Sequence, residues 1–463
     1  MTRGPRGRSR RASRFFHREV NRLVGAQMTP DLRVLDLGCG EGSLLEQISV
    51  LSYVGVDIDE KALSKAEEAL PQGTWIHRAI EDFEGPPMPN PDTIVLSMVL
   101  DEVRDVQIVL SRVHEWSHAR SRTVVVTYSR LWRPVLWLAE LLGLKTGNQS
   151  ESYLPRQEVQ NLLEVSGFEI TKRQYGILSP IWVPFLSRFA NKWLAPLPII
   201  RHLCLVHVTT ARPLRKRSGP IESVSIVIAA RNESGHIREL IDRIPKLAHD
   251  QEVIFVEGGS TDNTWQTIID ETNRLSGRKG ERFHVLRQNG KGKGDAVRQG
   301  FAMATGEIVM ILDADISVPP EELPKFVEAL SRDVCEFANG TRLTYQMETN
   351  AMKFLNMLGN KGFGLLFTFL LGQPVRDTLC GTKVMWRSDY VRLASNRSRF
   401  GSLDPFGDFD LLFGASAMGL RIRDIPIHYK ERTYGETNIS RFRHGWLLLR
   451  MAFVAASRLK FVG

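Results

Sequence analysis

Residues 306–320 read GEIVMILDADISVPP, and this stretch decides the fold of the region around it. The unbroken apolar run at 308–312 predicts a short strand that is buried on both faces of a parallel sheet. Two carboxylates follow at once, in Asp313-Ala314-Asp315. At the carboxyl ends of strands in an open α/β sheet, such groups lie where ligands bind. Carboxylate oxygens there suit Mg²⁺ or Mn²⁺ holding a diphosphate, although solvated acids that cap a strand give the same pattern.

Three features upstream make a nucleotide site the better interpretation. The apolar stretch 223–230 runs into Asn232-Glu233, and the stretch 252–256 runs into Glu257-Gly258. Residues 290–295, GKGKGD, form a flexible basic turn before an expected helix. A lysine and the amides of a helix N-terminus are suited to meet a diphosphate. Two strands that each end in an acid are thus followed by a basic turn and by Asp313-Ala314-Asp315, a DxD motif. This order predicts a nucleotide-sugar site.

These motifs resemble those of the family 2 glycosyltransferases of the GT-A fold, and within them the dolichol-phosphate mannosyltransferase-like group. The resemblance extends from residue 223 to the C-terminus. It implies transfer of a hexose from a GDP- or UDP-hexose to a polyprenyl phosphate or another lipid-linked acceptor. It implies that Asp313 and Asp315 hold the metal. By the same resemblance the nucleotide sugar is bound by Ala230, Asn232, Glu233, Glu257, Gly258, Lys293, Asp313, Ala314 and Asp315.

The resemblance also suggests catalytic and acceptor residues further along the chain. Residues 406–412, FGDFDLL, take the place of the family's Phe-Asp-x-Glu-Leu-Leu motif, which implies catalytic roles for Asp410, Asp408 and Asp315. Asp410 either removes a hydroxyl proton or, with an anionic lipid phosphate, only orients the acceptor. Alternatively, Asp410 is only an acid at the N-terminus of a helix, where the helix dipole favours negative charge. The acceptor-phosphate residues implied by position are Arg342, Lys383 and Arg432, for which solvated surface charge remains the alternative.

The first half of the chain carries a different pair of motifs. Residues 33–45, RVLDLGCGEGSLL, predict a strand, a glycine-rich turn and the start of a helix, and residues 53–59, YVGVDID, predict a second strand that ends in an acid. Glycines permit a tight turn and a close approach of the backbone to a ligand. An acid at the end of the next strand is placed to accept hydrogen bonds from ribose hydroxyls.

DLGCGEG followed by GVDID resembles the class I S-adenosylmethionine-dependent methyltransferases, over roughly residues 20–210. The residues that would bind the donor are then Asp36, Gly38, Gly40, Gly42, Asp57, Ile58, Glu81 and Asp82. GCGEGSLL is also similar to the small-RNA 2′-O-methyltransferases, but their Glu-x-x-Glu-His metal motif is absent from residues 98–102, MVLDE. A degenerate nucleotide fold kept as a scaffold is a further alternative.

Length and composition bound the domain organisation. A chain of 463 residues with 43% hydrophobic residues is large enough for two or three domains. We predict a disordered basic tail at 1–14, a methyltransferase domain at 15–211, a linker at 212–222 and a glycosyltransferase domain at 223–463 that ends in an amphipathic segment. The expected fold class is α/β, with two Rossmann-like domains. The four cysteines are widely spaced and form no CxxC pair, which argues against disulfides or zinc and fits a reducing cytosol.

Several segments indicate contact with a membrane surface. No uncharged apolar run reaches the length of a span, about 18 residues. Residues 363–371 and 446–459 are apolar stretches suited to lie in the interface plane, and the arginine-rich tail suits anionic head groups, although core helices and a solubilising tail are the alternatives. The aromatic residues between 129 and 211 fit a lid or core, or a membrane contact. We expect a cytoplasmic protein, peripheral on the cytoplasmic face of a membrane.

The sequence therefore predicts a bifunctional transferase that uses S-adenosylmethionine and a Mg²⁺- or Mn²⁺-bound nucleotide sugar. The methyl acceptor is expected to be related to the glycosylation product. The alternatives are a glycosyltransferase with an inactive, ligand-binding methyltransferase domain, an RNA-modifying methyltransferase and a membrane-recruited scaffold. No nucleic acid partner is expected.

Overall fold

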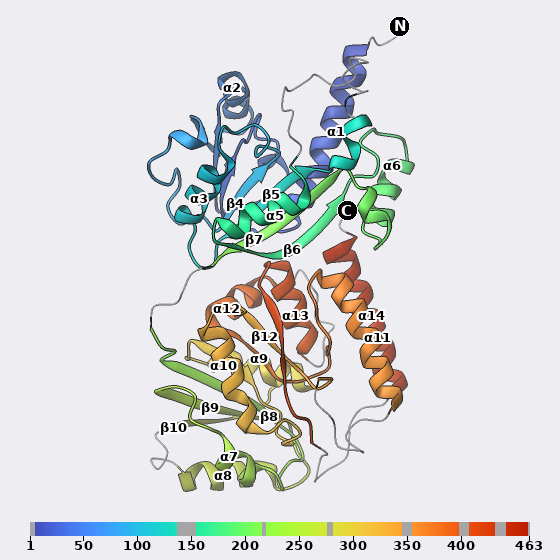
Figure 1. Cartoon of the computed structure of the whole chain (residues 1–463). Coiled ribbons are helices and arrows are strands. Elements are labelled where there is room, and N and C mark those ends of the chain that lie inside the picture. The colour runs from blue at the N-terminus through green and yellow to red at the C-terminus, as the bar shows by residue number, and fades with distance from the viewer. Residues whose placement is uncertain are drawn as a thin grey trace. The chain divides into compact units, whose positions relative to one another are not determined.

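The computed structural model describes residues 5–135, 137, 154–214, 219–275, 281–344, 354–397, 407–430 and 441–461. The chain divides into two compact units (Figure 1). The first comprises Met1–Arg215, Ala417–Gly419 and Leu459–Gly463, and the second comprises Lys216–Ser416 and Leu420–Arg458. The last residues thus belong to the first unit, whereas the sequence-based boundaries give all of 223–463 to the second.

The sheet of the first unit has the strand order β3-β2-β1-β4-β5-β7-β6. Its strands are β1 (Arg33–Leu37), β2 (Ser52–Asp57), β3 (Thr74–His77), β4 (Thr93–Ser97), β5 (Arg122–Tyr128), β6 (Phe168–Gly176) and β7 (Val206–Pro213). Strand β1 pairs in parallel with β2 and with β4, while β7 runs antiparallel to β5 and β6. The strand order reverses between β1 and β4, and ligands of open α/β sheets bind at the carboxyl ends of the strands beside such a reversal.

Helices cover both faces of this sheet, and its central strands β1, β4 and β5 are largely buried (Figure 1). The helical elements are α1 (Pro5–Gly25), η1 (Leu45–Gln47), α2 (Glu60–Ala69), η2 (Ile80–Asp82), α3 (Val106–Trp116), η3 (Arg130–Trp132), α5 (Arg156–Val165), α6 (Leu186–Phe189), η4 (Ala190–Leu194) and η5 (Ile200–Leu203). Val20 of α1 packs in one core cluster with Val34, and Val113 of α3 packs in the other with Leu35. Neighbouring residues of β1 thus face opposite cores, as the two-residue period of a strand requires.

Helix α1 starts inside the tail for which the sequence predicts disorder. It begins at Pro5 and continues through the expected lead-in helix to Gly25. Proline fits the first turn of a helix and arginine is a good helix former, so the basic stretch extends the amphipathic segment that follows it.

The sheet of the second unit has the order β10-β9-β8-β11-β13-β12-β14. Its strands are β8 (Ser223–Ala230), β9 (Asp250–Glu257), β10 (Glu281–Arg287), β11 (Ile308–Ile311), β12 (Phe337–Thr341), β13 (Lys383–Trp386) and β14 (Ile422–Pro426). Strand β11 is fully buried, pairs in parallel with β8 and pairs antiparallel with β13, which confirms the strand predicted before the DxD. Strands β8, β9 and β10 are parallel, so their carboxyl ends and that of β11 share one edge.

The helical elements of this unit are α7 (Ile237–Arg243), α8 (Thr264–Leu275), α9 (Lys293–Met303), η6 (Pro320–Glu322), α10 (Leu323–Ser331), α11 (Phe354–Leu371), α12 (Arg387–Ser395), α13 (Asp408–Ala417), α14 (Arg441–Ala455) and η8 (Ala456–Lys460). Helices α11 and α14 lie side by side (Figure 1). Two mixed α/β sheets of seven strands each confirm the expected fold class. Within the described ranges, no helix combines the length and apolar character needed to cross a bilayer.

Candidate active sites

The glycine-rich turn of the first unit follows β1 and has three residues in the left-handed region. Gly38, Gly40 and Gly42 have φ angles of 79°, 54° and 70°, which side chains rarely permit. A Cβ on Gly38 would lie 2.7 Å from Val99 Cγ2, whereas nothing lies within 4 Å of a Cβ on Gly40. A Cβ on Gly42 would lie 2.3 Å from the indole of Trp75. Gly40 therefore borders open space, while Gly38 and Gly42 are required by packing.

Asp57, at the end of β2, holds this turn in place. One carboxylate oxygen accepts a hydrogen bond from the Gly40 amide at 2.7 Å, and the other accepts one from the Asp59 amide at 2.9 Å. Each oxygen keeps a further lone pair for a ligand hydroxyl. Ile58, the next residue, is largely exposed. The structure thus brings Asp57 and the glycine turn together, as the sequence predicts.

Glu81 and Asp82 lie in η2, which follows β3 at the same edge of the sheet. A carboxylate oxygen of Glu81 accepts a hydrogen bond from the Arg104 amide at 2.8 Å, and Asp82 is exposed. Both carboxyl groups are therefore near the ends of the strands that carry the glycine turn and Asp57.

Asp36 lies one residue before the end of β1 and is buried. The Tyr53 hydroxyl donates a hydrogen bond to it at 2.5 Å. Burial raises the pKa of the Asp36 carboxyl to about 7, the Tyr53 hydrogen bond opposes this shift, and the charge of Asp57 adds to it. Asp36 is thus a buried acid that holds its proton up to near neutral pH.

This raised pKa predicts a loss of stability as pH increases. The folded state binds the proton more tightly than the unfolded state, whose pKa is near 3.8. The free energy of unfolding should therefore fall between about pH 4 and pH 7, by at most about 1.4 kcal/mol per pH unit. Asp36→Asn should lose this dependence and gain stability relative to wild type as pH rises from 5 to 7. Urea unfolding at several pH values measures it, and parallel curves for both proteins would contradict it.

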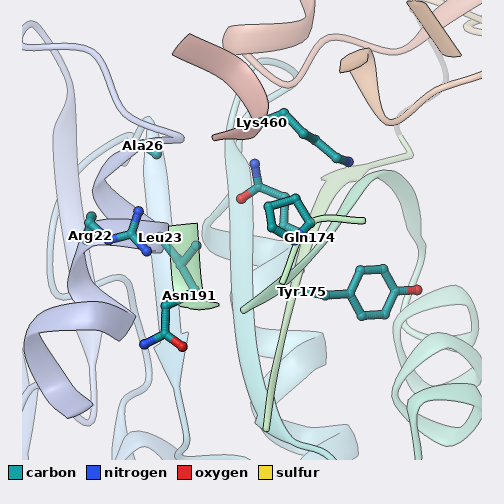
Figure 2. Close-up of a pocket in the computed structure, with 8 residues that line it drawn as sticks. Arg22, Leu23, Ala26, Gln174, Tyr175, Asn191 and Lys460 are labelled. Atoms are coloured by element: carbon teal, nitrogen blue, oxygen red, sulfur yellow. The ribbon is translucent and has the colours of Figure 1, made fainter. Parts of the chain in front are cut away.

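A small cavity in the first unit has a lining that includes neither the glycine turn nor Asp57. It is lined by residues of α1 and β6 together with Asn191, Pro196 and Lys460 (Figure 2). Its volume of about 20 Å³ holds about one water molecule, and no residue predicted for the donor site borders it. A broader surface hollow along α3 is bordered by Glu84, Asp105 and Glu115 among others. No residue of the glycine turn lines it either. The donor site is therefore assigned from the glycine turn and Asp57.

In the second unit, the ends of β8 and β9 are tied together by hydrogen bonds. The Asn232 side-chain carbonyl accepts a hydrogen bond from the Thr261 amide at 2.8 Å, and the Asn232 amide donates to the Ser260 hydroxyl at 3.0 Å. A carboxylate oxygen of Glu257 accepts a hydrogen bond from the Ser260 amide at 2.5 Å. The Gly258 amide donates to the Ala230 carbonyl at 2.9 Å. These predicted nucleotide residues therefore form one continuous wall.

Glu233 is turned into the protein beside this wall. Its carboxylate lies 2.8 Å from His236 Nδ1, and both side chains are buried. Its amide donates to the Thr264 hydroxyl at 2.9 Å. Glu233 therefore stabilises the turn into α7, and this placement favours a supporting role over direct contact with a nucleotide.

Lys293 of α9 reaches across to the DxD. Its ammonium lies 2.5 Å from a carboxylate oxygen of Asp313, and the side chains are 29% and 25% exposed. Burial would lower the pKa of Lys293, but the charges of Asp313, Asp408 and Asp315 outweigh it and raise the pKa well above its usual range. The turn before α9 is held by Asp295, which accepts a hydrogen bond from the Gly290 amide at 3.0 Å. The basic turn and the DxD thus meet, as predicted.

Gly381 closes over this pair. A Cβ there would lie 2.2 Å from an oxygen of Asp313 and 2.3 Å from the Lys293 ammonium. A side chain at this position would displace the Asp313 carboxylate or the Lys293 ammonium from their present contact. Gly381 lies two residues before Lys383 in the sequence, which by itself gives no sign that it touches Asp313.

Asp315 is shaped by its own turn. One carboxylate oxygen accepts hydrogen bonds from the Ser317 amide at 3.0 Å and the Ser317 hydroxyl at 2.6 Å. The residue between them, Ile316, has a φ of 55°, which is strained for a β-branched side chain. Strained backbone of this kind concentrates at functional sites, where the surrounding structure maintains it.

Asp313 and Asp315 fit a Mg²⁺ or Mn²⁺ ion that is shared with a diphosphate. These metals are commonly held by one or two carboxylates plus substrate phosphates and water. In the part of the chain that the structure describes, no cluster of three or more His, Cys, Asp or Glu side chains forms a complete metal cage. The Lys293 ammonium against Asp313 marks the place as one suited to positive charge.

The two remaining acids predicted as catalytic, Asp408 and Asp410, both lie in the first turn of α13 and are buried. A Cβ on the preceding Gly407 would lie 2.8 Å from the Cα of Gly294, which brings α13 against the start of α9. Asp408 acts electrostatically on Lys293, whereas Asp410 forms an ion pair with Arg397 at 2.6 Å. Arg397 has no motif around it, so nothing in the sequence pointed to this pair. Asp408 is therefore the acid of α13 whose charge reaches the DxD and its lysine.

Two of the three expected acceptor-phosphate residues, Arg342 and Lys383, have their charged groups engaged inside the protein. Arg342 forms a two-pronged ion pair with Asp377, with Nε–Oδ2 and Nη2–Oδ1 distances of 2.7 and 2.8 Å. Lys383 is buried in β13 and its ammonium donates to the Cys380 carbonyl. Arg432 lies outside the described residues. The placement of Arg342 and Lys383 does not support phosphate binding, because their charged groups already contact the Asp377 carboxylate and the Cys380 carbonyl.

Comparison with protein families agrees with both folds. A model described as glycosyl transferase family 2 matches residues 225–393, and a model described as a methyltransferase domain matches residues 8–173. Both are domains of transferases. The chain therefore contains a methyltransferase domain followed by a family 2 glycosyltransferase domain, which confirms the two resemblances seen in the sequence.

Solved structures similar to each part are also known. The glucosyl-3-phosphoglycerate synthase of Mycobacterium tuberculosis, in complex with Mn²⁺, UDP and glucosyl-3-phosphoglycerate, is 21% identical, with 51% of this chain and 80% of that chain covered and a TM-score of 0.38. The TehB-like SAM-dependent methyltransferase of Corynebacterium glutamicum is 16% identical, with 42% and 88% covered and a TM-score of 0.28. The plantazolicin methyltransferase BpumL, in complex with SAH, is 19% identical, with 44% and 90% covered and a TM-score of 0.31.

Proposed function

We propose that the protein transfers a hexose from a GDP- or UDP-hexose to a polyprenyl phosphate or another lipid-linked acceptor. We propose also that it transfers a methyl group from S-adenosylmethionine to a related acceptor. The observation that carries the first activity is the meeting of Asp313, Asp315 and Lys293 at the carboxyl edge of a family 2 glycosyltransferase sheet. The glycine turn tied to Asp57 carries the second.

At the sugar site, the residues of this chain bind and orient the donor. Asp313 and Asp315 would hold a divalent cation, and this cation would supply the positive charge that neutralises the diphosphate leaving group. Lys293 stands beside Asp313, where it can contact a phosphate oxygen. Asp408 and Asp410 line the start of α13, and an anionic phosphate acceptor needs orientation rather than removal of a proton. Incubation of the protein with labelled GDP- and UDP-hexoses, a polyprenyl phosphate and Mn²⁺ or Mg²⁺ tests this activity.

At the methyl site, Asp57 is proposed to accept hydrogen bonds from the donor's ribose hydroxyls. Asp57→Ala should weaken S-adenosylmethionine binding by about 1–3 kcal/mol, because it removes those bonds and the one to the Gly40 amide. Calorimetry of the full chain measures the affinity. Asp59→Ala is a matched control, since Asp59 only caps α2. Unchanged affinity in Asp57→Ala would assign Asp57 to the fold of the turn alone.

The glycosyltransferase domain is proposed to work at the cytoplasmic surface of a membrane. Helix α14 exposes Trp446, Leu449 and Phe453 along one stripe, with the exposed Arg450 beside it. Helix α11, next to it, exposes Leu365. The four cysteines are free, which fits a reducing compartment.

Flotation with anionic vesicles should recover the protein, and high salt should release part of it. Replacing Trp446 and Phe453 with serine should lower partition onto the vesicles about tenfold or more, because the variant lacks the two rings whose burial in the bilayer favours binding. Val391→Ser is the matched control, because Val391 is also an exposed apolar residue of this unit but lies on α12. A wild-type protein that stays in the aqueous fraction would favour a water-soluble acceptor.

A further inference from the structure

Residues 177–203 of the first unit expose an unusual amount of apolar surface. Phe185 is 93% exposed. Six other apolar side chains of this stretch are more than half exposed, namely Ile181, Trp182, Leu186, Phe189, Ile199 and Leu203. The surface continues to the exposed Leu131, because the Trp132 indole donates a hydrogen bond to the Leu203 carbonyl at 2.8 Å. Soluble proteins rarely expose contiguous apolar surface on this scale without a partner.

The loop that carries these side chains is inverted, with its polar groups inside. The Asn191 side-chain oxygen, Oδ1, accepts hydrogen bonds from the Leu178 and Ser179 amides, both at 2.9 Å. The Ser187 hydroxyl accepts one from the Val183 amide at 2.7 Å and donates one to the Ile181 carbonyl at 2.7 Å. Ser187 and Asn191 are buried, while Phe185, Leu186 and Phe189 beside them are exposed. Internal hydrogen bonds therefore hold the loop in a conformation that leaves these apolar side chains outside.

Phe185 sits at the tip in a costly conformation. Its φ and ψ are 60° and −46°, and the Leu186 amide donates to the Pro184 carbonyl at 2.7 Å. A three-residue turn of this hand is rare and strained for a residue with a side chain. The strained backbone at Phe185 carries an almost fully exposed aromatic ring. This combination favours contact of the ring with a partner of the protein.

Charge identifies the kind of surface that fits. The chain has no Asp or Glu between Glu169 and Glu222, although these types make up 52 of its 463 residues. Within the exposed stretch the charged side chains are Arg188, Lys192 and Arg201, all basic. Lys192 lies 5.6 Å from the centre of the Trp193 ring. Aromatic rings beside basic side chains are typical of segments that lie at the boundary of head groups and acyl chains.

We propose that residues 177–203 dock the methyltransferase unit on a bilayer with anionic lipids. Trp182, Phe185 and Phe189 enter the acyl boundary, and the basic side chains meet the head groups. This surface belongs to a different unit from the α14 stripe, so it goes beyond the membrane contact proposed for the glycosyltransferase domain. It does not depend on the identity of either reaction.

Flotation of the full chain tests the surface. Phe185→Ser combined with Phe189→Ser should lower partition into phosphatidylcholine vesicles containing phosphatidylglycerol at least tenfold. Arg188→Glu combined with Lys192→Glu should lower it on these vesicles but not on phosphatidylcholine alone. Retained S-adenosylmethionine binding shows that the variants are folded.

A fluorophore gives an independent reading. An environment-sensitive dye can be attached at Phe185→Cys alone, because the native cysteines are all buried. Its fluorescence emission should shift to the blue when the anionic vesicles are added. Glu67→Cys, on the exposed side of α2, should not respond. An unresponsive dye at 185 in vesicle-bound protein would overturn the proposal, as would unchanged partition of the double serine variant. If Trp446→Ser with Phe453→Ser then still releases the protein, the membrane contact lies on α14 and not on residues 177–203.

Discussion

Asp315→Ala is expected to lower hexose transfer by about 10²–10³-fold, with S-adenosylmethionine binding unchanged. The carboxylate is held toward the edge of the sheet by Ser317 and by the strained backbone at Ile316. A diphosphate placed beside two carboxylates would be repelled, and a divalent cation held by Asp313 and Asp315 would offset that repulsion. Without Asp315, Asp313 alone faces the diphosphate, and its oxygen is already shared with Lys293.

The same assay includes chelation and a matched variant. A chelator should reproduce the loss, and added Mn²⁺ or Mg²⁺ should restore wild type but not Asp315→Ala. Glu328→Ala removes an exposed acid of α10 and should leave the rate unchanged. Transfer that survives both chelation and Asp315→Ala would refute a metal-dependent mechanism.

The strands that carry both sites could be predicted because their signals are local. An apolar run followed by acids defines β11 and Asp313, and a strand with a glycine turn defines β1. Each signal lies within a few residues and follows from backbone burial and turn chemistry. Parallel pairing then brings the strand ends together, which is why Asp57 and Gly40 meet across 17 residues.

The residues that the sequence did not reveal depend on distant partners. Gly381 matters because it packs on Asp313, far away in the chain, whereas glycine is common in loops for the freedom of its backbone alone. Lys383 occupies a motif position but is buried in β13, where its charge is met by the Cys380 carbonyl. The inverted loop around Ser187 was also unforeseen, because the prolines at positions 180, 184, 196 and 198 indicate only that no long helix forms there.

Arg342→Ala is expected to destabilise the glycosyltransferase unit by about 3–5 kcal/mol, because it leaves the fully buried Asp377 without its charge partner. Asp377 accepts two hydrogen bonds from the guanidinium and further ones from the Arg342 and Leu379 amides, both at 3.1 Å. The pair ties the end of β12 to the loop that carries Gly381 against Asp313. Its loss should therefore also loosen the sugar site.

Scanning calorimetry of the full chain measures the loss as a lower unfolding temperature. Arg342→Lys keeps the charge but cannot make the two-pronged contact, so it should fall between wild type and Arg342→Ala. Arg342→Met combined with Asp377→Leu removes both charges and should recover part of the stability, since no unpaired carboxylate remains. If Arg342 served mainly to bind an acceptor phosphate, Arg342→Ala would leave the unfolding temperature unchanged and raise only the KM for the acceptor. That result would contradict the structural role that the Asp377 contact assigns to Arg342.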